Sequence, residues 1–477
     1  MLFNSVEYLV FLPVVFILYW YLNSKALVAR NVLLLLSSYF FYGWWDWRFL
    51  LLILLSTVVD YFCGIYIEKG NTKKLKLIFL WLSISTNLGI LIFFKYFGFF
   101  IESWISLLNS LGYQAVSYWT MNIVLPVGIS FYTFQTLSYT IDVYKRKIPA
   151  EKDFIAFSVF VSFFPQLVAG PIERAKSLLS QIKKRKNFKY SQGVSGLRLI
   201  LWGFFKKIVI ADSLAPHVDR IFSNYSNLHG GILFLGVIYF AFQIYCDFSG
   251  YSDIAIGTAK LFGINLMVNF RFPYFSRNIS EFWRRWHISL TTWFRDYLYI
   301  PLGGSKISKI NSVRNVFIVF AVSGLWHGAN WTFLMWGVTH AVFYLPFFLT
   351  KKNSRFSKIV AWERYLPTIK EVLQIITTFF IICLGWIFFR SETISDAFRY
   401  IERMVFDFHI PYSYRSGIEY VVIIVILDWL LRKDENGDLS VLDEINRIFR
   451  WVIYLFFGFW VMSSFNTYEA PFIYFQF

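Results

Sequence analysis

The residue types that could do chemistry gather between Gln243 and Trp331. Within this stretch, His327 stands between Gly324 and Gly328 in an otherwise apolar region. A neutral imidazole can act as general base for a hydroxyl group that attacks an acyl carbon. The same side chain could instead join two membrane helices by a hydrogen bond. The residues alone leave both interpretations of this histidine open.

A second candidate histidine, His287, lies in a basic and aromatic stretch at residues 280–297. Read as one helix at about 100° per residue, the stretch has an aromatic stripe, and Arg284, His287 and Arg295 lie on the neighbouring stripe. This pattern predicts a single amphipathic helix with aromatic anchors and a cationic face. Such a face can bind lipid headgroups, or its guanidinium groups can bind the phosphates of an anionic cofactor. The spacing alone favours the lipid interpretation.

A third polar group interrupts the apolar stretch at residues 243–253. Because polar groups are costly inside a membrane, one interpretation is a broken helix that lines a polar cavity. The other is a turn at the membrane surface, where Ser252 or Asp253 caps the next helix. A helix-capping residue in the wall of a cavity would fit both interpretations. The candidate cavity-lining residues are Asp247, Ser249, Asp253 and Asn330.

The remaining histidines and the cysteines carry weaker signals. A structural role is favoured for His217, His229, His340 and His409. His340 in particular lies on a largely different helix face from His327. The three cysteines are Cys63, Cys246 and Cys383, which are far apart and form no CxxC pair. This spacing suggests neither a zinc site nor a disulfide framework, and we expect no metal.

The composition indicates a membrane protein. The chain has 477 residues, of which 57% are hydrophobic and 16% charged, against roughly 25% charged residues in soluble domains. Apolar runs of spanning length recur from end to end between short charged loops. The net charge of +17 would suggest nucleic acid in a soluble protein, but here the basic residues flank apolar runs. We therefore expect one all-α polytopic membrane domain over residues 1–477 and no nucleic-acid partner.

The apolar runs also predict a topology. Candidate spans cover residues 6–22, 31–47, 49–67, 78–100, 123–141, 194–211, 231–248, 313–326, 330–349, 372–389, 418–431 and 449–463. The basic loops are residues 69–76, 145–147, 176–189, 271–314, 351–358 and 432–450. All of them fall on one side, which the positive-inside rule makes the cytoplasm. Both chain ends, the loop 212–230 and the stretch 390–417 then lie outside.

This topology requires the apolar run 154–171 to return to the side from which it came. Basic clusters flank the run, and a full crossing would place them on opposite sides. Pro165, Gly170 and Pro171 are expected to break a helix there. Irregular backbone at membrane depth is tolerated only where protein or a cavity covers it. We therefore predict a re-entrant or interfacial segment.

Several motifs together resemble one known family. They include Trp283-Arg-Arg-Trp-His-Ile-Ser-Leu290, Asp296-Tyr-Leu-Tyr-Ile-Pro-Leu-Gly-Gly304 and Gly324-Leu-Trp-His-Gly-Ala329. Residues 1–5, 125–135, 164–174, 245–253 and 472–477 match as well. The chain is similar over nearly its whole length to the membrane-bound O-acyltransferase (MBOAT) family. It is most similar to the bacterial branch that O-acetylates alginate and other polysaccharides.

The resemblance implies a fold and a site. The fold is a ring of about 11–12 transmembrane helices, with re-entrant or interfacial helices, around a thinned centre where two opposed funnels meet. The core is expected at about 120–350, with peripheral helices at 1–110 and 370–477. The two family histidines correspond to His287 and His327, and His327 has the position of the essential catalytic one. Arg284, Arg285 and Arg295 would hold the donor's phosphates.

The resemblance also implies a reaction. The donor substrate is acetyl-CoA, with no permanently bound cofactor, and the acetyl group passes through a bacterial cell (inner) membrane to a polysaccharide outside. A partner acyltransferase with a Ser-Asp-His (SGNH-type) site usually completes the transfer. The residues do not decide whether His327 is a general base or a transient acyl acceptor. D-alanyl transfer to teichoic acid from a carrier protein is the nearest alternative, and a polysaccharide transporter is a more distant one.

Overall fold

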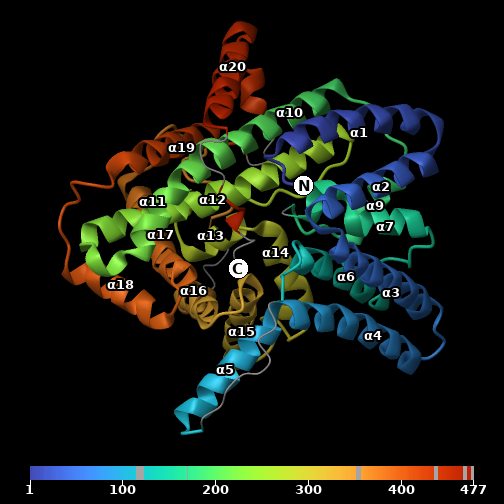
Figure 1. Ribbon diagram of the computed structural model, residues 1–477, viewed down its shortest axis with the longest axis horizontal. Coiled ribbons are helices and arrows are strands. Elements are labelled where there is room, and N and C mark those ends of the chain that lie inside the picture. Colours follow the sequence, from blue (N-terminus) through green and yellow to red (C-terminus); the bar gives the residue numbers. More distant parts are fainter. Residues whose placement is uncertain (114–122, 169, 351–355, 435–438, 466–469, 474–477) are drawn as a thin grey trace. The chain divides into compact units, whose positions relative to one another are not determined.

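The computed structural model describes residues 1–113, 123–168, 170–350, 356–434, 439–465 and 470–473. Every regular element in these ranges is a helix (Figure 1). Each of the predicted spans coincides with a helix, although the one predicted at 123–141 becomes helical only at Ile129. The all-α class predicted from hydropathy is therefore confirmed.

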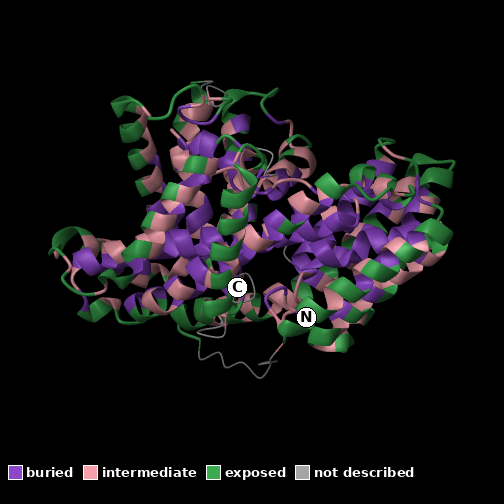
Figure 2. Cartoon of the chain, turned by 90° about the horizontal axis from the view of Figure 1, so that it is seen from above, coloured by how far each residue is buried: buried purple, intermediate pink, exposed green. Residues whose placement is uncertain are grey.

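The chain forms two compact units, and the first comprises residues 1–193 and 258–267. Its helices are α1 (Val6–Lys25), α2 (Leu27–Asp46), α3 (Leu50–Lys69), α4 (Lys73–Leu91), α5 (Phe97–Ser110), α6 (Ile129–Tyr144), α7 (Phe154–Ser162), α8 (Phe164–Leu167) and α9 (Ala175–Ile182). Buried residues, purple in Figure 2, fill the interior between these helices.

The second unit comprises residues 194–257 and 268–477. It holds most of α10 (Tyr190–Phe204) and α12 (Gly230–Leu261). Its other helices are α11 (Asp212–Ser223), α13 (Ile279–Arg285), α14 (Ile288–Phe294), α15 (Lys309–His327), α16 (Trp331–Leu349), α17 (Ile369–Arg390), α18 (Ile394–Phe406), α19 (Ile418–Leu431) and α20 (Arg447–Ser464). The π-helical segment η3 (Phe205–Ala211) joins α10 to α11. The predicted outer loop at 212–230 contains the helix α11, and its side of the membrane stays a prediction.

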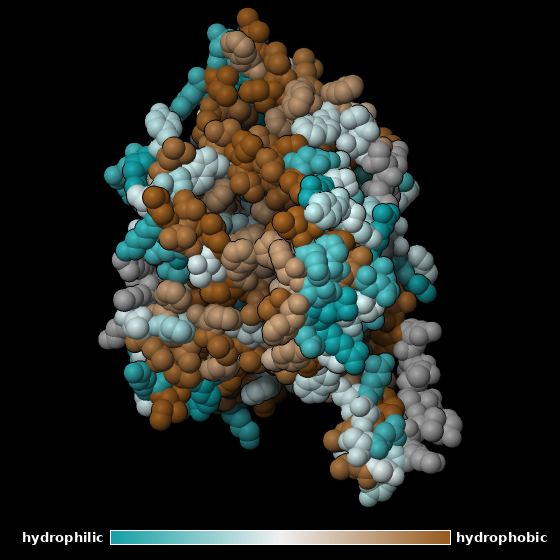
Figure 3. All heavy atoms as spheres, turned by 90° about the vertical axis from the view of Figure 1, so that its left-hand side faces the viewer, coloured by the Kyte–Doolittle hydropathy of each residue, from teal (hydrophilic) through white to brown (hydrophobic). Residues whose placement is uncertain are grey.

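Within the described part of the chain, six segments are long and apolar enough to cross a membrane. They are Val6–Lys25, Leu27–Lys69, Lys73–Ser110, Gly230–Leu261, Trp331–Leu349 and Ile369–Arg390. The second contains α2 and α3, and the third contains α4 and α5. Apolar side chains cover much of the surface in Figure 3, and a bilayer is the solvent that such a surface requires. The protein is a multi-pass membrane protein, and the number and direction of its crossings stay predictions.

A buried carboxylate organises the first unit. Asp60 of α3 is fully buried and accepts hydrogen bonds from Ser83 and Asn87 of α4. The amide oxygen of Asn87 in turn accepts hydrogen bonds from Ser56, at 2.7 Å, and from Thr136 of α6, at 3.1 Å. Buried polar groups cost free energy unless they are hydrogen-bonded. This network therefore favours one arrangement of α3, α4 and α6.

The apolar run at 154–171 is interrupted, as its proline and glycine residues predict. Helix α7 ends at Ser162, Phe163 has non-helical backbone with ψ of 108°, and α8 begins at Phe164. Pro165 lies in the first turn of α8, where the missing N–H of proline breaks no helical hydrogen bond. The run is therefore not one spanning helix, and its return to the same side of the membrane stays a prediction.

The predicted interruption at 243–253 is absent, because α12 continues unbroken from Gly230 to Leu261. Gly250 is used for close packing instead. A Cβ atom on Gly250 would lie 2.8 Å from the carbonyl oxygen of Gly203, and a Cβ atom on Gly203 would lie 2.6 Å from that of Gly250. The two glycines let α10 and α12 cross at backbone contact. Both sequence interpretations, a broken helix and a capped turn, are therefore wrong.

Candidate functional site

His327 is the last residue of α15, and its imidazole is buried with 3% of the residue exposed. Its ring centroid lies 5.0 Å from that of Trp326, 4.9 Å from that of Trp336 and 5.4 Å from that of Phe389. The chain leaves the helix at Gly328, which has extended backbone and packs against the ring of Phe333 with no room for a Cβ atom. The imidazole of His327 is therefore positioned by the C-terminal end of α15 and enclosed by aromatic rings.

His287 lies between α13 and α14 with left-handed backbone, at φ 44° and ψ 55°. Residues 280–297 are therefore not the single helix that periodicity predicts. Trp286, which is extended and 1% exposed, packs against Phe270 at 5.0 Å and Trp386 at 5.2 Å between ring centroids. Burial of this indole outweighs the modest helical preference of the sequence. Such backbone is uncommon outside glycine and is enriched at functional sites.

The imidazole of His287 is buried and oriented by its neighbours. Its Nδ1 lies 3.4 Å from Oδ1 of Asn269, which also accepts a 2.7 Å hydrogen bond from Ser289. The ring of Phe248 contacts it edge-on at 4.6 Å between centroids. Burial lowers the pKa of His287 from 6.5 to about 3. The imidazole is therefore neutral at physiological pH.

The two candidate histidines share one neighbour. The indole of Trp326 lies 5.8 Å from the His287 ring and 5.0 Å from the His327 ring, measured between centroids. Both histidines belong to the second unit. His340 joins the same aromatic cluster, 4.9 Å from Trp336, and neither of its ring nitrogens has a hydrogen-bond partner among the described residues. The structure thus gathers three histidines, of which the sequence analysis singled out two.

The predicted cationic stripe does not form, because the helix breaks between Arg285 and Ile288. Arg284 is exposed, and its guanidinium donates a 2.8 Å hydrogen bond to the carbonyl oxygen of Phe356. Arg295 is also exposed and forms a 2.8 Å ion pair with its neighbour Asp296. The broken backbone separates these two cations into different elements.

Arg285, the third predicted cation, is buried inside the protein. It is 4% exposed and forms a 3.2 Å ion pair with the fully buried Glu281. Glu281 also pairs with Arg277 at 3.0 Å. Removing one partner of a buried ion pair is strongly destabilising, because it leaves a buried charge without compensation. The contacts of Arg285 are therefore structural ones within and next to α13.

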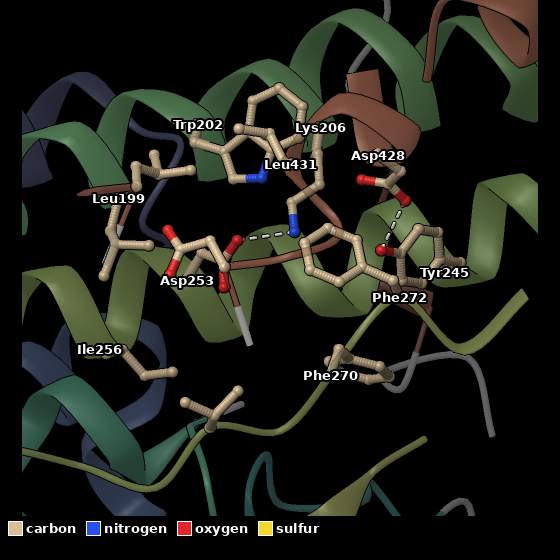
Figure 4. Close-up of a pocket in the computed structure, with 13 residues that line it drawn as sticks. Leu199, Trp202, Lys206, Tyr245, Asp253, Ile256, Phe270, Phe272, Asp428 and Leu431 are labelled. Carbon is tan, nitrogen blue, oxygen red and sulfur yellow. Dashed lines mark hydrogen bonds and ion pairs between the residues drawn. The ribbon is translucent and has the colours of Figure 1, made fainter. Parts of the chain in front are cut away.

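A small cavity, partly open to solvent, lies in the second unit (Figure 4). Asp253, one of the predicted cavity-lining residues, borders it and forms a 2.6 Å ion pair with Lys206. Lys206 also donates a 2.9 Å hydrogen bond to Ser249. Across the cavity, Asp428 accepts a 2.8 Å hydrogen bond from the phenol of Tyr245. The walls are completed by apolar and aromatic side chains, including those of Leu199, Trp202, Phe270, Phe272 and Leu431.

The other three predicted cavity-lining residues do not line this cavity, and Ser249 is linked to it only by the hydrogen bond from Lys206. Asp247 forms a 2.8 Å ion pair with Lys207 in the interior. Asn330 caps α16 by accepting a 3.0 Å hydrogen bond from the backbone N–H of Thr332. The sequence analysis missed the partners Lys206 and Lys207. Two lysines inside the apolar run 194–211 were the available signal, because ionisable residues within membrane segments need partners.

Comparison with known proteins identifies the family of this chain. The model of the membrane-bound O-acyltransferase family matches residues 49–389. Probable alginate O-acetylase AlgI of Pseudomonas aeruginosa is 40% identical over 413 residues, which cover 85% of this chain and 75% of that protein.

Two further relatives have different acceptors in their names. Peptidoglycan O-acetyltransferase of Helicobacter pylori is 34% identical over 434 residues, covering 85% of this chain and 80% of that protein. Teichoic acid D-alanyltransferase of Bacillus subtilis is 27% identical over 285 residues, covering 57% of this chain and 70% of that protein. With a family match over most of its length, this chain belongs to the membrane-bound O-acyltransferase family and is an O-acyltransferase.

Proposed function

We propose that this enzyme takes an acetyl group from cytoplasmic acetyl-CoA and passes it across the bacterial inner membrane to hydroxyl groups of an extracytoplasmic polysaccharide. The names of relatives with 34–40% identity, alginate O-acetylase and peptidoglycan O-acetyltransferase, support an acetyl group and a polysaccharide. A partner acyltransferase with a Ser-Asp-His site completes the transfer outside. Both chain ends lie outside in this proposal.

The observation that carries the proposal is the pair of buried imidazoles, His287 and His327, whose rings both lie next to the indole of Trp326. An imidazole at this site can remove the proton of an acceptor hydroxyl while its oxygen attacks the thioester carbon and the CoA thiolate leaves. It can also take the acyl group itself before the acceptor does. Either role requires the neutral imidazole, which burial favours.

A shared site for donor and acceptor removes a large transport cost. Acetyl-CoA carries several phosphates, and a charged group does not cross about 30 Å of hydrocarbon cheaply. If donor and acceptor reach the histidines from opposite sides, only the small acetyl group has to cross. Arg284 and Arg295 are exposed and supply guanidinium groups for the donor's phosphates in this proposal. Arg285 contributes by holding α13 through Glu281.

The test measures base-labile acetate on the surface or secreted polysaccharide. Cells that lack the gene are complemented with the wild type, with His327→Ala, or with His409→Ala as a matched control at an exposed histidine. We expect the wild type and His409→Ala to restore the ester, and His327→Ala to lose about 10²–10⁴-fold in transfer rate, the usual contribution of a general base.

Three outcomes would contradict parts of this proposal. If expressed His327→Ala restores the ester fully, the assignment of the catalytic histidine is wrong. If acetate does not change in any strain, the acetyl group is wrong. Ester-linked D-alanine in the same samples would then support transfer to teichoic acid, the reaction named for the 27% identical relative.

A further inference from the structure

A buried cluster of three charges lies in the second unit and has no part in the reaction proposed above. The ammonium group of Lys207, in η3, is 2.8 Å from a carboxylate oxygen of Asp212 and 2.8 Å from one of Asp247. The three side chains are only 1%, 5% and 4% exposed. Burying charges costs several kcal/mol for each ion. A cluster of this kind inside a membrane protein therefore indicates a specific task.

The same cluster holds a segment from near the end of the chain, residues 470–473. Lys207 donates a 3.0 Å hydrogen bond to the carbonyl oxygen of Ala470. The second oxygen of Asp247 accepts a 2.7 Å hydrogen bond from the backbone N–H of Ile473. Lys207 thus contacts Asp212, Asp247 and Ala470 at the same time. Lys207 and Asp247 thus bind the backbone at both ends of this short segment.

Between these two bound residues, Phe472 packs against a ring that contacts His287. Its side chain is fully buried. The Phe472 ring lies 4.3 Å from the ring of Tyr251 and 6.0 Å from that of Phe248, measured between centroids. Phe248 is the residue whose ring contacts His287 at 4.6 Å. Continuous packing therefore runs from the charge cluster through Phe472 and Phe248 to His287.

We propose that Lys207 and Asp247 are positioning residues, which clamp residues 470–473 so that Phe472 holds Phe248 against His287. The clamp keeps the His287 ring dry and in its orientation toward Asn269. The consequence for catalysis rests on the proposed function, whereas the clamp itself does not. Without the clamp, residues 470–473 dissociate from Lys207 and Asp247, and the Phe248 ring moves away from His287. Water then reaches the imidazole of His287.

Diethyl pyrocarbonate tests the clamp without any need for activity, since this reagent modifies accessible neutral imidazoles. The purified full-length variants are Lys207→Met, Asp247→Asn and Phe472→Leu, each compared with the wild type in one detergent. Mass spectrometry follows the modification of His287, with the exposed His409 as internal reference. We expect the modification of His287 to accelerate by about tenfold in all three variants, because local opening exposes it, while His409 is unaffected.

Acyl transfer by the same proteins tests the catalytic consequence. We expect the rate to fall by about a hundredfold, as misplacement of a reacting group by roughly 1 Å does. The acid limb of the pH–rate profile should move to higher pH, because a hydrated His287 regains a pKa nearer 6.5. The double variant Asp247→Asn/Phe472→Leu should lose no more than the worse single variant, since both changes break one path.

Asp219→Asn is the control for removing a carboxylate, because it breaks an exposed ion pair with Arg390 that does not touch the segment. It should change neither the modification rate nor the acyl-transfer rate. An unchanged His287 reactivity in folded Asp247→Asn would overturn the clamp, and so would additive losses in the double variant. If His287 becomes reactive as expected but the wild type transfers no acetyl group, the clamp stands and the proposed function fails.

Discussion

At His287, a left-handed backbone and a buried neutral imidazole occur in one residue. The backbone places the ring between Phe248 and Asn269, and burial lowers its pKa to about 3. The sequence motif identified the residue but not this conformation. Periodicity predicted a helix through it, because Trp286 and His287 are both tolerated in helices and only the surrounding rings oppose one.

The lowered pKa of His287 makes stability depend on pH. The unfolded chain binds a proton near pH 6.5, whereas the folded chain does so only near 3. Protons therefore favour the unfolded state as pH falls below 6.5, and the free energy of unfolding drops by up to about 1.4 kcal/mol per pH unit. We expect the melting temperature of His287→Gln, measured in detergent, to fall less between about pH 7.5 and about pH 5.5 than that of the wild type. Equal losses in the two proteins would contradict the burial of this imidazole.

At the scale of elements, the contact between α15 and α16 positions His327. Gly324 of α15 packs directly on the carbonyl group of Phe333, and Gly337 of α16 packs on that of Phe320. Neither site has room for a Cβ atom. The two helices must therefore stay at backbone contact for His327 to remain between Trp326 and Trp336.

Gly324→Ala should push these helices apart. We expect a loss of about 1–3 kcal/mol in stability, the usual cost of overpacking, together with reduced acyl transfer, because His327 lies one helical turn away. Thermal unfolding and the acetate assay measure the two effects. Gly458→Ala in α20 is the matched control, since no atom lies within 4 Å of its Cβ position. It should be neutral or more stable by up to about 1 kcal/mol. Equal effects of the two substitutions would show that the close contact is unimportant.

At the scale of the whole molecule, the distribution of charge predicts which loops face the cytoplasm. The chain contains three cysteines, Cys63, Cys246 and Cys383, and all are buried. A cysteine introduced at the exposed Lys184 or Ser226 would therefore be the main accessible thiol. An impermeant maleimide applied to intact spheroplasts should label Ser226→Cys at once and Lys184→Cys only after lysis. Labelling of Lys184→Cys before lysis and of Ser226→Cys only after lysis would show that the predicted topology is inverted. Labelling of both before lysis would show that the loop with Lys184 does not face the cytoplasm.

The sequence by itself determined the all-α membrane class and indicated an O-acyltransferase. Hydropathy is a local property, so the predicted spans coincide with helices, except for the first six residues of the span predicted at 123–141. The interruption of the run 154–171 was predictable for the same reason, because proline acts on its own backbone. His287 and His327 stood out because ionisable side chains in apolar surroundings are rare and costly.

Only the tertiary structure decided that residues 243–253 stay helical, that residues 280–297 do not, and which charges are neutralised. The polar stretch of α12 stays helical because lysines of another element pair with Asp247 and Asp253 and because Gly250 meets Gly203. Residues 280–297 break because Trp286 gains more from burial than one helical turn gains from its hydrogen bonds. These contacts join residues far apart in the chain. Their free energies exceed the fraction of a kcal/mol per residue by which local propensities differ, so periodicity could not reveal them.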